Sequence, residues 1–154
     1  MLKDKITVIE TNIDDLLPLA YENLFEKLFK KGALDVYITP IQMKKLRPAV
    51  LLTVLCKAGL KDKLTSVIFE ETPTFGMRFY QVTRYKMERR TETVRTKYGP
   101  VRVKVGGKGK KIKNVSPEYE DCKRLAQDAK VPLRRVYQQA RCTFQDRLGT
   151  KEKR

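Results

Sequence analysis

The sequence predicts an α+β fold, a ferredoxin-like βαββαβ sandwich followed by a β-hairpin and C-terminal helices. Up to residue 88, runs rich in β-branched residues alternate with segments whose apolar residues recur every three or four positions. Two further strand-like runs flank a Gly-Pro turn, and two helical segments separated by a proline follow them. A four-stranded antiparallel sheet with two helices on one face is therefore expected first.

The elements of the sandwich follow from local patterns. The first helix should begin near Leu16 and stop at Gly32, because glycine favours the left-handed conformation that ends helices. Strands 34–43 and 49–56 are close enough to form a hairpin with a basic tip. In all, strands are expected at residues 5–12, 34–43, 49–56 and 77–88, and a second helix at residues 60–71.

The second half of the chain predicts a smaller, more basic structure. Residues 91–96 and 101–105 form the hairpin, and the glycine-rich segment 106–111 is expected to be a flexible loop. Ser116 and Pro117 should open a helix, and Pro132 should separate it from a final helix. We therefore expect a ferredoxin-like subdomain over residues 1–88, with a basic hairpin and helical extension over residues 89–154, packed as one unit.

Composition limits the chemistry. The 154 residues include no His, which excludes Ser-His-Asp, Cys-His and His-metal mechanisms. Three cysteines without a C-x-x-C pair predict neither a disulfide scaffold nor a zinc site. The start of the chain does not resemble a signal peptide, and no apolar run reaches the roughly 18 residues that span a bilayer, so a cytoplasmic protein without membrane attachment is expected.

The positive charge is unevenly distributed. Lys and Arg exceed Asp and Glu by 34 to 18, and residues 86–154 hold 21 of the basic residues but only 8 of the acidic ones. Such a field suits polyphosphate, nucleic acid or an acidic partner. A functionally silent, Lys-rich surface of the kind found in thermophiles gives the same composition.

Three carboxylates follow the first predicted strand. Glu10, Asp14 and Asp15 lie at a strand-to-helix junction, where hard oxygen ligands suit Mg²⁺ or Mn²⁺ together with a nucleotide's phosphates. Alternatively, Asp14 or Asp15 caps the helix that follows.

Basic residues are available to contact phosphates. Lys44, Lys45 and Arg47 lie at the predicted hairpin tip, and Arg78 follows the turn at Gly76. A protein that binds a metal-nucleoside triphosphate complex needs both kinds of residue. Carboxylates hold the metal, and cations neutralise the remaining phosphate oxygens.

A second interpretation concerns the last two helices. The segment 124–137 has the outline of a helix-turn-helix, whose second helix carries Arg134, Arg135, Gln138 and Arg141. Arg and Gln read guanine and adenine in the major groove, so a basic DNA-binding module is the alternative function. Any two successive amphipathic helices give this outline, and nucleic acid is the less favoured partner.

Several blocks in order resemble one family, the LarC nickel insertion proteins, over their C-terminal domain. The blocks are Glu10-Thr11-Asn12-Ile13-Asp14-Asp15, Ala33-Leu34-Asp35-Val36, Thr39-Pro40-Ile41-Gln42-Met43-Lys44-Lys45, Arg47-Pro48, Tyr98-Gly99-Pro100-Val101-Arg102-Val103-Lys104 and Pro117-Glu118-Tyr119-Glu120-Asp121-Cys122. The resemblance implies a CTP- and Mn²⁺-dependent nickel chelatase, classed as a lyase. Such an enzyme inserts nickel, its substrate, into pyridinium-3,5-bisthiocarboxylic acid mononucleotide to complete the cofactor of lactate racemase, and CTP is consumed to CMP and pyrophosphate.

The resemblance also implies roles for residues and partners. Glu10, Asp14 and Asp15 are expected to face the metal, and five residues are expected to bind the nucleotide: Lys44, Lys45, Arg47, Arg78 and Lys104. A second, weaker group of acids is a candidate for contact with ribose or metal, and it consists of Glu118, Glu120 and Asp121. No catalytic residue and no nickel ligand can be named. The chain is expected to bind nucleotide, to need the family's N-terminal domain or subunit to load nickel, and to form a homo-oligomer, a trimer or hexamer.

Overall fold

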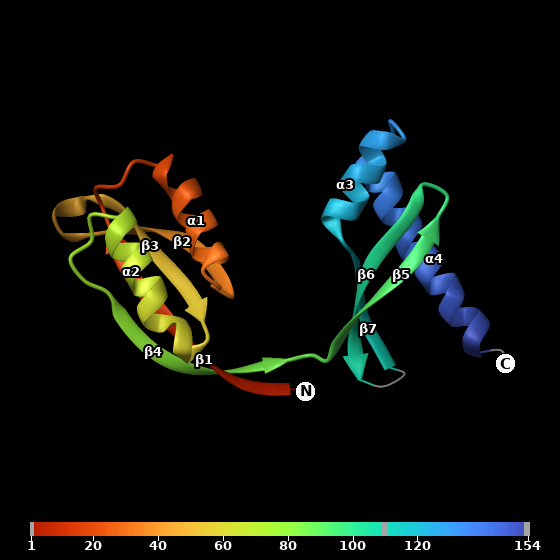
Figure 1. Ribbon diagram of the computed structural model, residues 1–154, viewed down its shortest axis with the longest axis horizontal. Helices are drawn as coiled ribbons and strands as arrows, with labels where there is room; N and C mark the ends of the chain where they lie inside the picture. The colour runs from red at the N-terminus through yellow and green to blue at the C-terminus, as the bar shows by residue number, and fades with distance from the viewer. Residues whose placement is uncertain (1, 109–110, 153–154) are drawn as a thin grey trace. The chain divides into compact units, whose positions relative to one another are not determined.

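The computed structural model describes residues 2–108 and 111–152. The chain divides into two compact units. The N-terminal unit comprises residues 3–85, and the C-terminal unit comprises residues 86–154 together with the first two residues. Figure 1 shows the elements of each unit.

The N-terminal unit contains a four-stranded sheet and two helices. Its elements are β1 (Leu2–Ile13), α1 (Ala20–Lys30), β2 (Asp35–Gln42), the 3₁₀ turn η1 (Lys44–Leu46), β3 (Pro48–Cys56), the 3₁₀ turn η2 (Ala58–Leu60), α2 (Lys61–Glu71) and β4 (Arg78–Lys86). The strand order is β2-β3-β1-β4, which is the ferredoxin-like order. The predicted fold class is confirmed.

Strand pairing is antiparallel. β3 pairs with β1 on one side and with β2 on the other, so that Glu10 lies opposite Thr53 and Thr53 lies opposite Tyr37. Side-chain bonds join Asp4 to Arg84 and Glu10 to Tyr80, so β1 and β4 also run in opposite directions.

The core of the N-terminal unit lies between the sheet and the two helices, which cover one face of it (Figure 1). Ile9 and Ile13 of β1 and Leu52 of β3 pack against Leu24 of α1 and Leu64 of α2. Because side chains alternate along a strand, Glu10 and its neighbours two residues away lie on the face without helices.

The predicted start of the first helix was wrong. α1 begins at Ala20, and Leu19 precedes it without a side-chain cap, so neither acid of the 14–15 pair caps this helix. A turn around Pro18 comes first, in which Ala20 N donates to Leu17 O over 2.9 Å. The end of the helix agrees with the prediction, because Gly32 adopts a φ of 103° just beyond α1.

The C-terminal unit contains a three-stranded sheet and two helices. Its elements are β5 (Arg89–Thr96), β6 (Gly99–Lys108), β7 (Lys111–Pro117), α3 (Tyr119–Asp128) and α4 (Leu133–Glu152). β6 is central and pairs antiparallel with both neighbours. Its buried residues Val101, Val103 and Val105 pack with a second core that includes Val136 and Phe144 of α4.

The third strand corrects the prediction of a hairpin followed by a flexible loop. Residues 106–108 belong to β6 and Lys111 begins β7, whereas residues 109 and 110 lie outside the described residues. A Cβ atom on Gly107 would lie 2.3 Å from the carbonyl oxygen of Lys111, so glycine is what permits this close return. Likewise, Ser116 and Pro117 end β7 and do not open α3.

Within the described ranges, no helix is both long enough and apolar enough to cross a membrane.

Candidate functional site

The acidic and basic residues singled out in the N-terminal unit meet at one end of its sheet. β1 ends at Ile13, which lies opposite Val50 near the start of β3. Asp14 therefore lies beside the β2–β3 tip, where Arg47 donates from Nη1 to Asp14 Oδ2 over 3.2 Å. The topology thus joins a predicted metal-facing acid to a predicted phosphate-binding cation.

Glu10 is the centre of a second group on the face without helices. Arg78 Nε donates to Glu10 Oε2 over 2.8 Å, and the Tyr80 hydroxyl donates to Glu10 Oε1 over 2.7 Å. Arg78 Nη1 also donates to Asn12 Oδ1 over 3.2 Å. Both oxygens of Glu10 are occupied, and its side chain is 15% exposed whereas that of Arg78 is 53% exposed. The guanidinium is held in place with much of its surface open to a ligand.

Tyr80 was not among the predicted residues. The hydrogen bond that it donates to Glu10 raises the pKa of Tyr80, and partial burial and the negative charge of Glu10 add to this effect. The cation at Arg78 acts in the opposite direction. Tyr80 follows Arg78 by two positions on a strand, so alternation was the available signal.

The turn before β4 is tied to β1. Thr11 Oγ1 donates to the carbonyl oxygen of Gly76 over 2.8 Å, and the hydroxyls of Thr11 and Thr74 lie 2.6 Å apart. Thr11 is buried, with 1% of its surface exposed. These bonds fix the start of β4 and with it the position of Arg78.

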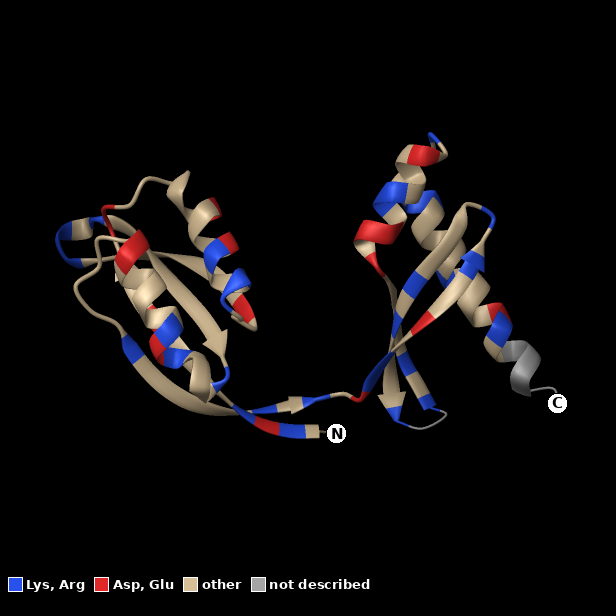
Figure 2. Ribbon diagram, in the orientation of Figure 1, with Lys and Arg blue, Asp and Glu red and all other residues tan. Residues whose placement is uncertain are grey.

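The tip between β2 and β3 presents the predicted basic residues (Figure 2). Lys44, Lys45 and Arg47 are all exposed. Lys45 and Leu46 adopt φ values of 59° and 57°, a left-handed conformation that residues other than glycine seldom adopt. The main chain closes the tip, since Met43 N donates to Arg47 O over 2.9 Å.

The three predicted metal-facing acids do not form a cage. Glu10 and Asp14 are paired with arginines, and Asp15 is exposed near Tyr21, whose pKa is raised by burial and, to a lesser extent, by this carboxylate. In the part of the chain that the structure describes, no three acidic or Cys side chains converge as metal ligands. A cation would find at most one or two carboxylates here.

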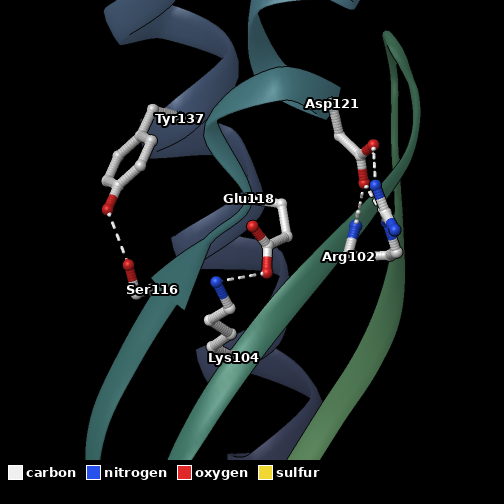
Figure 3. A network of polar contacts seen from close by, with 6 residues as sticks. All are labelled: Arg102, Lys104, Ser116, Glu118, Asp121 and Tyr137. Carbon is white, nitrogen blue, oxygen red and sulfur yellow. Dashed lines mark hydrogen bonds and ion pairs between the residues drawn. The ribbon is translucent and has the colours of Figure 1, made fainter. Parts of the chain in front are cut away.

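Lys104 belongs to the C-terminal unit, where it takes part in a network of ion pairs between β6 and the start of α3 (Figure 3). Its Nζ lies 2.9 Å from Glu118 Oε1. Arg102 donates to Asp121 three times: its main-chain N and its Nε each reach Oδ2 over 2.9 Å, and its Nη2 reaches Oδ1 over 2.9 Å. Two of the acids in the second predicted group therefore attach α3 to the sheet.

The Arg102 guanidinium lowers the pKa of Asp121 to about 2, and the main-chain N–H of Arg102 acts in the same direction. Burial of the carboxyl opposes both effects. Asp121 is therefore ionised at neutral and mildly acidic pH, and its role in the structure is to hold α3.

Comparison with known proteins shows the family to which a chain with these two units belongs. A family model described as nickel insertion protein matches residues 1–137. The chain belongs to the nickel insertion protein family, as the sequence blocks indicated. The match includes α3 and the beginning of α4, so the helix-turn-helix alternative receives no support from it.

Two curated relatives illustrate the similarity. The pyridinium-3,5-bisthiocarboxylic acid mononucleotide nickel insertion protein of Thermotoga sp. (strain RQ2) is 44% identical over 130 residues, which are 84% of this chain and 32% of that protein. The protein of the same name from Desulfitobacterium hafniense (strain DSM 10664 / DCB-2) is 47% identical over 131 residues, 85% of this chain and 33% of that protein. The chain spans about a third of the length of these relatives.

A solved structure matches nearly the whole chain. It is the apo form of LarC2, the C-terminal domain of a cyclometallase involved in the synthesis of the NPN cofactor of lactate racemase. The TM-score is 0.87 at 43% identity, and the match covers 94% of this chain and 99% of that one. A protein of Methanopyrus kandleri AV19, 23% identical with a TM-score of 0.65 over 90% of this chain and 87% of that one, has the same fold.

Proposed function

We propose that this chain is the nucleotide-binding part of a nickel chelatase that acts on pyridinium-3,5-bisthiocarboxylic acid mononucleotide. The product would be the cofactor of lactate racemase, and CTP would be consumed to CMP and pyrophosphate. The observation that carries the proposal is the match to the C-terminal domain of a cyclometallase over 99% of that domain. Because the relatives are about three times as long, nickel insertion itself is assigned to the complete protein.

The end of the first sheet is the proposed triphosphate site. Arg47 and Arg78 keep 60% and 53% of their side-chain surfaces exposed while each is oriented by an acid. Arginine binds phosphate through two parallel N–H bonds, so an oriented but accessible guanidinium suits this role. Lys44 and Lys45 would add point charges from the tip.

The residues fit a divalent ion that arrives with its nucleotide. Mg²⁺ and ions like it are held by one or two carboxylates plus substrate phosphates, whereas a resident ion needs a fuller set of protein ligands. Asp14 and Asp15 are the proposed carboxylates for Mn²⁺ or Mg²⁺. When bound, the ion would neutralise charge on the phosphates.

Two residues receive different roles from those first expected. Glu10 already accepts hydrogen bonds at both oxygens, so we assign it to positioning Arg78 and not to direct metal contact. Lys104 is paired with Glu118, and a phosphate would have to replace that carboxylate before Lys104 could bind nucleotide.

Isothermal titration with CTP, in the presence and absence of Mn²⁺, tests the proposal. Binding should require the metal, and CTP should bind more tightly than the other nucleoside triphosphates. The double variant D14N/D15N should weaken this binding with little change in melting temperature, because neither acid caps α1. No binding of CTP, or equal metal-free binding of all four nucleotides, would refute the proposal.

The matched control is Asp62→Asn. Asp62 is an acid of the same unit whose side chain is 94% exposed and whose carboxylate pairs with the neighbouring Lys61 over 3.3 Å. This variant removes one negative charge without touching the end of the sheet, so metal-dependent binding should be unchanged.

We also propose that the protein forms a homo-oligomer, a trimer or hexamer. β2 and β4 are the edge strands of the first sheet, and open edges favour pairing with another copy. Light scattering coupled to size exclusion would measure the mass in solution, and a monomer at micromolar concentration would contradict this part of the proposal.

A further inference from the structure

A pocket in the C-terminal unit lies outside the proposed nucleotide site. It has a volume of about 350 Å³ and is lined by Lys97, Tyr98, Arg135, Gln138, Gln139 and Cys142. The first two belong to the turn between β5 and β6, and the other four recur at intervals of three or four residues along α4. One face of α4 therefore forms a wall of the pocket.

The charge of this pocket is uncompensated. No acidic side chain lines it, and neither Lys97 nor Arg135 forms an ion pair with any residue in the described ranges. Some cations of the same unit are paired with acids, as Arg102 is with Asp121 and Arg147 with Glu92, whereas Lys97 and Arg135 line one hollow together without an acid. Two unpaired cations that share one concave surface favour an anionic ligand.

The turn that carries Lys97 is held rigidly. Thr96 Oγ1 donates to the carbonyl oxygen of Gly99 over 2.8 Å and accepts from Tyr98 N over 3.1 Å. Gly99 adopts a φ of 130°, and a Cβ atom there would lie 2.8 Å from Leu125 Cδ2 of α3. The Lys97 ammonium lies 5.1 Å from the centre of the Tyr98 ring. A ligand would thus meet a wall that is already ordered.

α4 is held as firmly on its other side. Val136, Ala140 and Phe144 alternate with the pocket residues along the helix and are almost fully buried in the second core. Their packing fixes the rotation of α4, so Arg135, Gln138 and Gln139 are presented to the pocket by a fixed scaffold.

We propose that this pocket binds the phosphate group of a phosphomonoester. Arg135 and Lys97 would contact the phosphate oxygens, and the Gln138 and Gln139 amides would bond to neighbouring hydroxyl or carbonyl groups. The volume suits a small molecule of up to mononucleotide size. That the ligand is a pyridinium mononucleotide rests on the proposed function, whereas recognition of the phosphate does not.

Because Cys142 lines the pocket, its reactivity can be used to measure whether a ligand is bound there. Cys142 is the exposed cysteine of the pocket, whereas Cys56 and Cys122 are fully buried and burial raises the pKa of both thiols. Iodoacetamide reacts with accessible thiolate, so it should modify Cys142 selectively in the folded protein. A ligand in the pocket should slow that reaction.

The experiment measures the rate of Cys142 alkylation by intact mass. Nicotinic acid mononucleotide, nicotinic acid riboside and inorganic phosphate are added separately, at equal ionic strength. We expect the mononucleotide to slow alkylation several-fold with a dissociation constant on the order of 1 mM, inorganic phosphate to act more weakly, and the riboside to have no effect. Equal protection by inorganic phosphate and the mononucleotide would overturn the assignment to a phosphomonoester, because the free anion would then be the ligand. Equal rates throughout, or equal protection by the riboside, would overturn the proposal.

The variants K97Q and R135Q should each weaken protection about tenfold, because each removes a charge-assisted hydrogen bond to phosphate. Arg134→Gln is the matched control, since Arg134 is the exposed neighbour on α4 that does not line the pocket. Protection that survives in the double variant K97Q/R135Q would also overturn the proposal.

Titration of the same samples with CTP and Mn²⁺ separates this inference from the proposed function. The pocket variants should bind CTP as the unmodified chain does. Cys142 protection without CTP binding would refute only the nucleotide site of the N-terminal unit, and CTP binding without mononucleotide protection would refute only the pocket.

Discussion

Two arginine-carboxylate pairs, one from each unit, differ in how firmly they are made. In the N-terminal unit, Arg47 meets Asp14 through one bond of 3.2 Å. In the C-terminal unit, Asp121 accepts three bonds from Arg102 and its side chain is 14% exposed. The number of hydrogen bonds that each carboxylate accepts, and not the number of ion pairs, distinguishes a pair that holds the fold from one that can open for a ligand.

The largest expected effects are on the free energy of unfolding, when a buried core residue of one unit is replaced and the other unit is left unchanged. Phe144 is 1% exposed in the core of the C-terminal unit, so Phe144→Ala should destabilise that unit by about 3 to 5 kcal/mol. Calorimetry should show that the C-terminal unit of the variant melts at a lower temperature than that of the unmodified chain. CTP binding at the N-terminal unit should persist. Loss of CTP binding with hydrogen exchange in β1–β4 unchanged would mean that the nucleotide site needs both units.

The converse variant is Leu52→Ala. Leu52 is fully buried in the core of the N-terminal unit, and the change should cost about 2 to 5 kcal/mol. Here CTP binding should be lost at temperatures at which the C-terminal unit is still folded. If Phe144→Ala and Leu52→Ala instead lower the melting temperature of a single transition by the same amount, the two units unfold together. Their stabilities would then not be independent.

A second prediction concerns the accessible arginines. Arg78→Ala should weaken CTP binding by about ten- to a hundredfold, because it removes a charge-assisted contact with phosphate. The control is Arg84→Ala, since Arg84 also lies on β4 and binds a β1 acid, Asp4, over 3.0 Å. Equal losses in the two variants, measured by isothermal titration, would show a general effect of charge.

A third prediction addresses the firmly made pair. Asp121→Asn should cost about 1 kcal/mol of stability in the C-terminal unit and leave CTP binding unchanged. The folded-state pKa of Asp121 is about 2, below its ordinary value of 3.8, so the stabilisation is present above pH 4 and is lost as the pH falls towards 2. Melting temperatures between pH 5 and pH 2 should fall less steeply in the variant. An unchanged slope would contradict the assignment.

The smallest expected effect is on the ionisation of Tyr80, followed by ultraviolet absorption. The bond to Glu10 raises the pKa of Tyr80, so its phenol should ionise at higher pH than an ordinary tyrosine. The difference in ultraviolet titration between the unmodified chain and Tyr80→Phe isolates this group. Glu10→Gln should move the titration back towards the ordinary value, and no movement would mean that another neighbour causes the shift.

The sequence was sufficient for the architecture of the first unit because its periodic patterns are long. β-branched runs and helical spacing alternate clearly there, and the confirmed strand order follows from that element order. The start of α1 was missed because Asp14 and Asp15 resemble capping residues, whereas the turn at Pro18 delays the helix to Ala20. The turn at residues 17–20, and not the capping preference of the two acids, therefore determines where α1 begins.

β7 was missed for a different reason. Its approach, the glycine- and lysine-rich segment 106–111, has the composition of a loop, and only the close contact between Gly107 and Lys111 explains the glycine. That contact is between residues of two strands, so no pattern along one strand reveals it. The same limit applies to Gly99, whose close contact with Leu125 of α3 is between residues far apart in the sequence.

The candidate site was predictable in its residue types but not in its pairing. Alternation and topology bring Glu10 and Arg78 to one face, yet the sequence does not indicate that both oxygens of Glu10 are already bound. Arg135 and Gln138 were first interpreted as readers of DNA bases, and the structure has them lining a pocket instead. Spacing along a helix identifies a face but not what covers it.

The left-handed residues at the β2–β3 tip have a consequence for affinity. Lys45 and Leu46 have few other main-chain conformations open to them, because strand pairing from Gln42 to Pro48 closes the segment on both sides. A tip that is ordered before binding loses little conformational entropy when an anion arrives. A few exposed cations can then give useful affinity, and a glycine at position 46 would relieve backbone strain while increasing the entropy lost on binding.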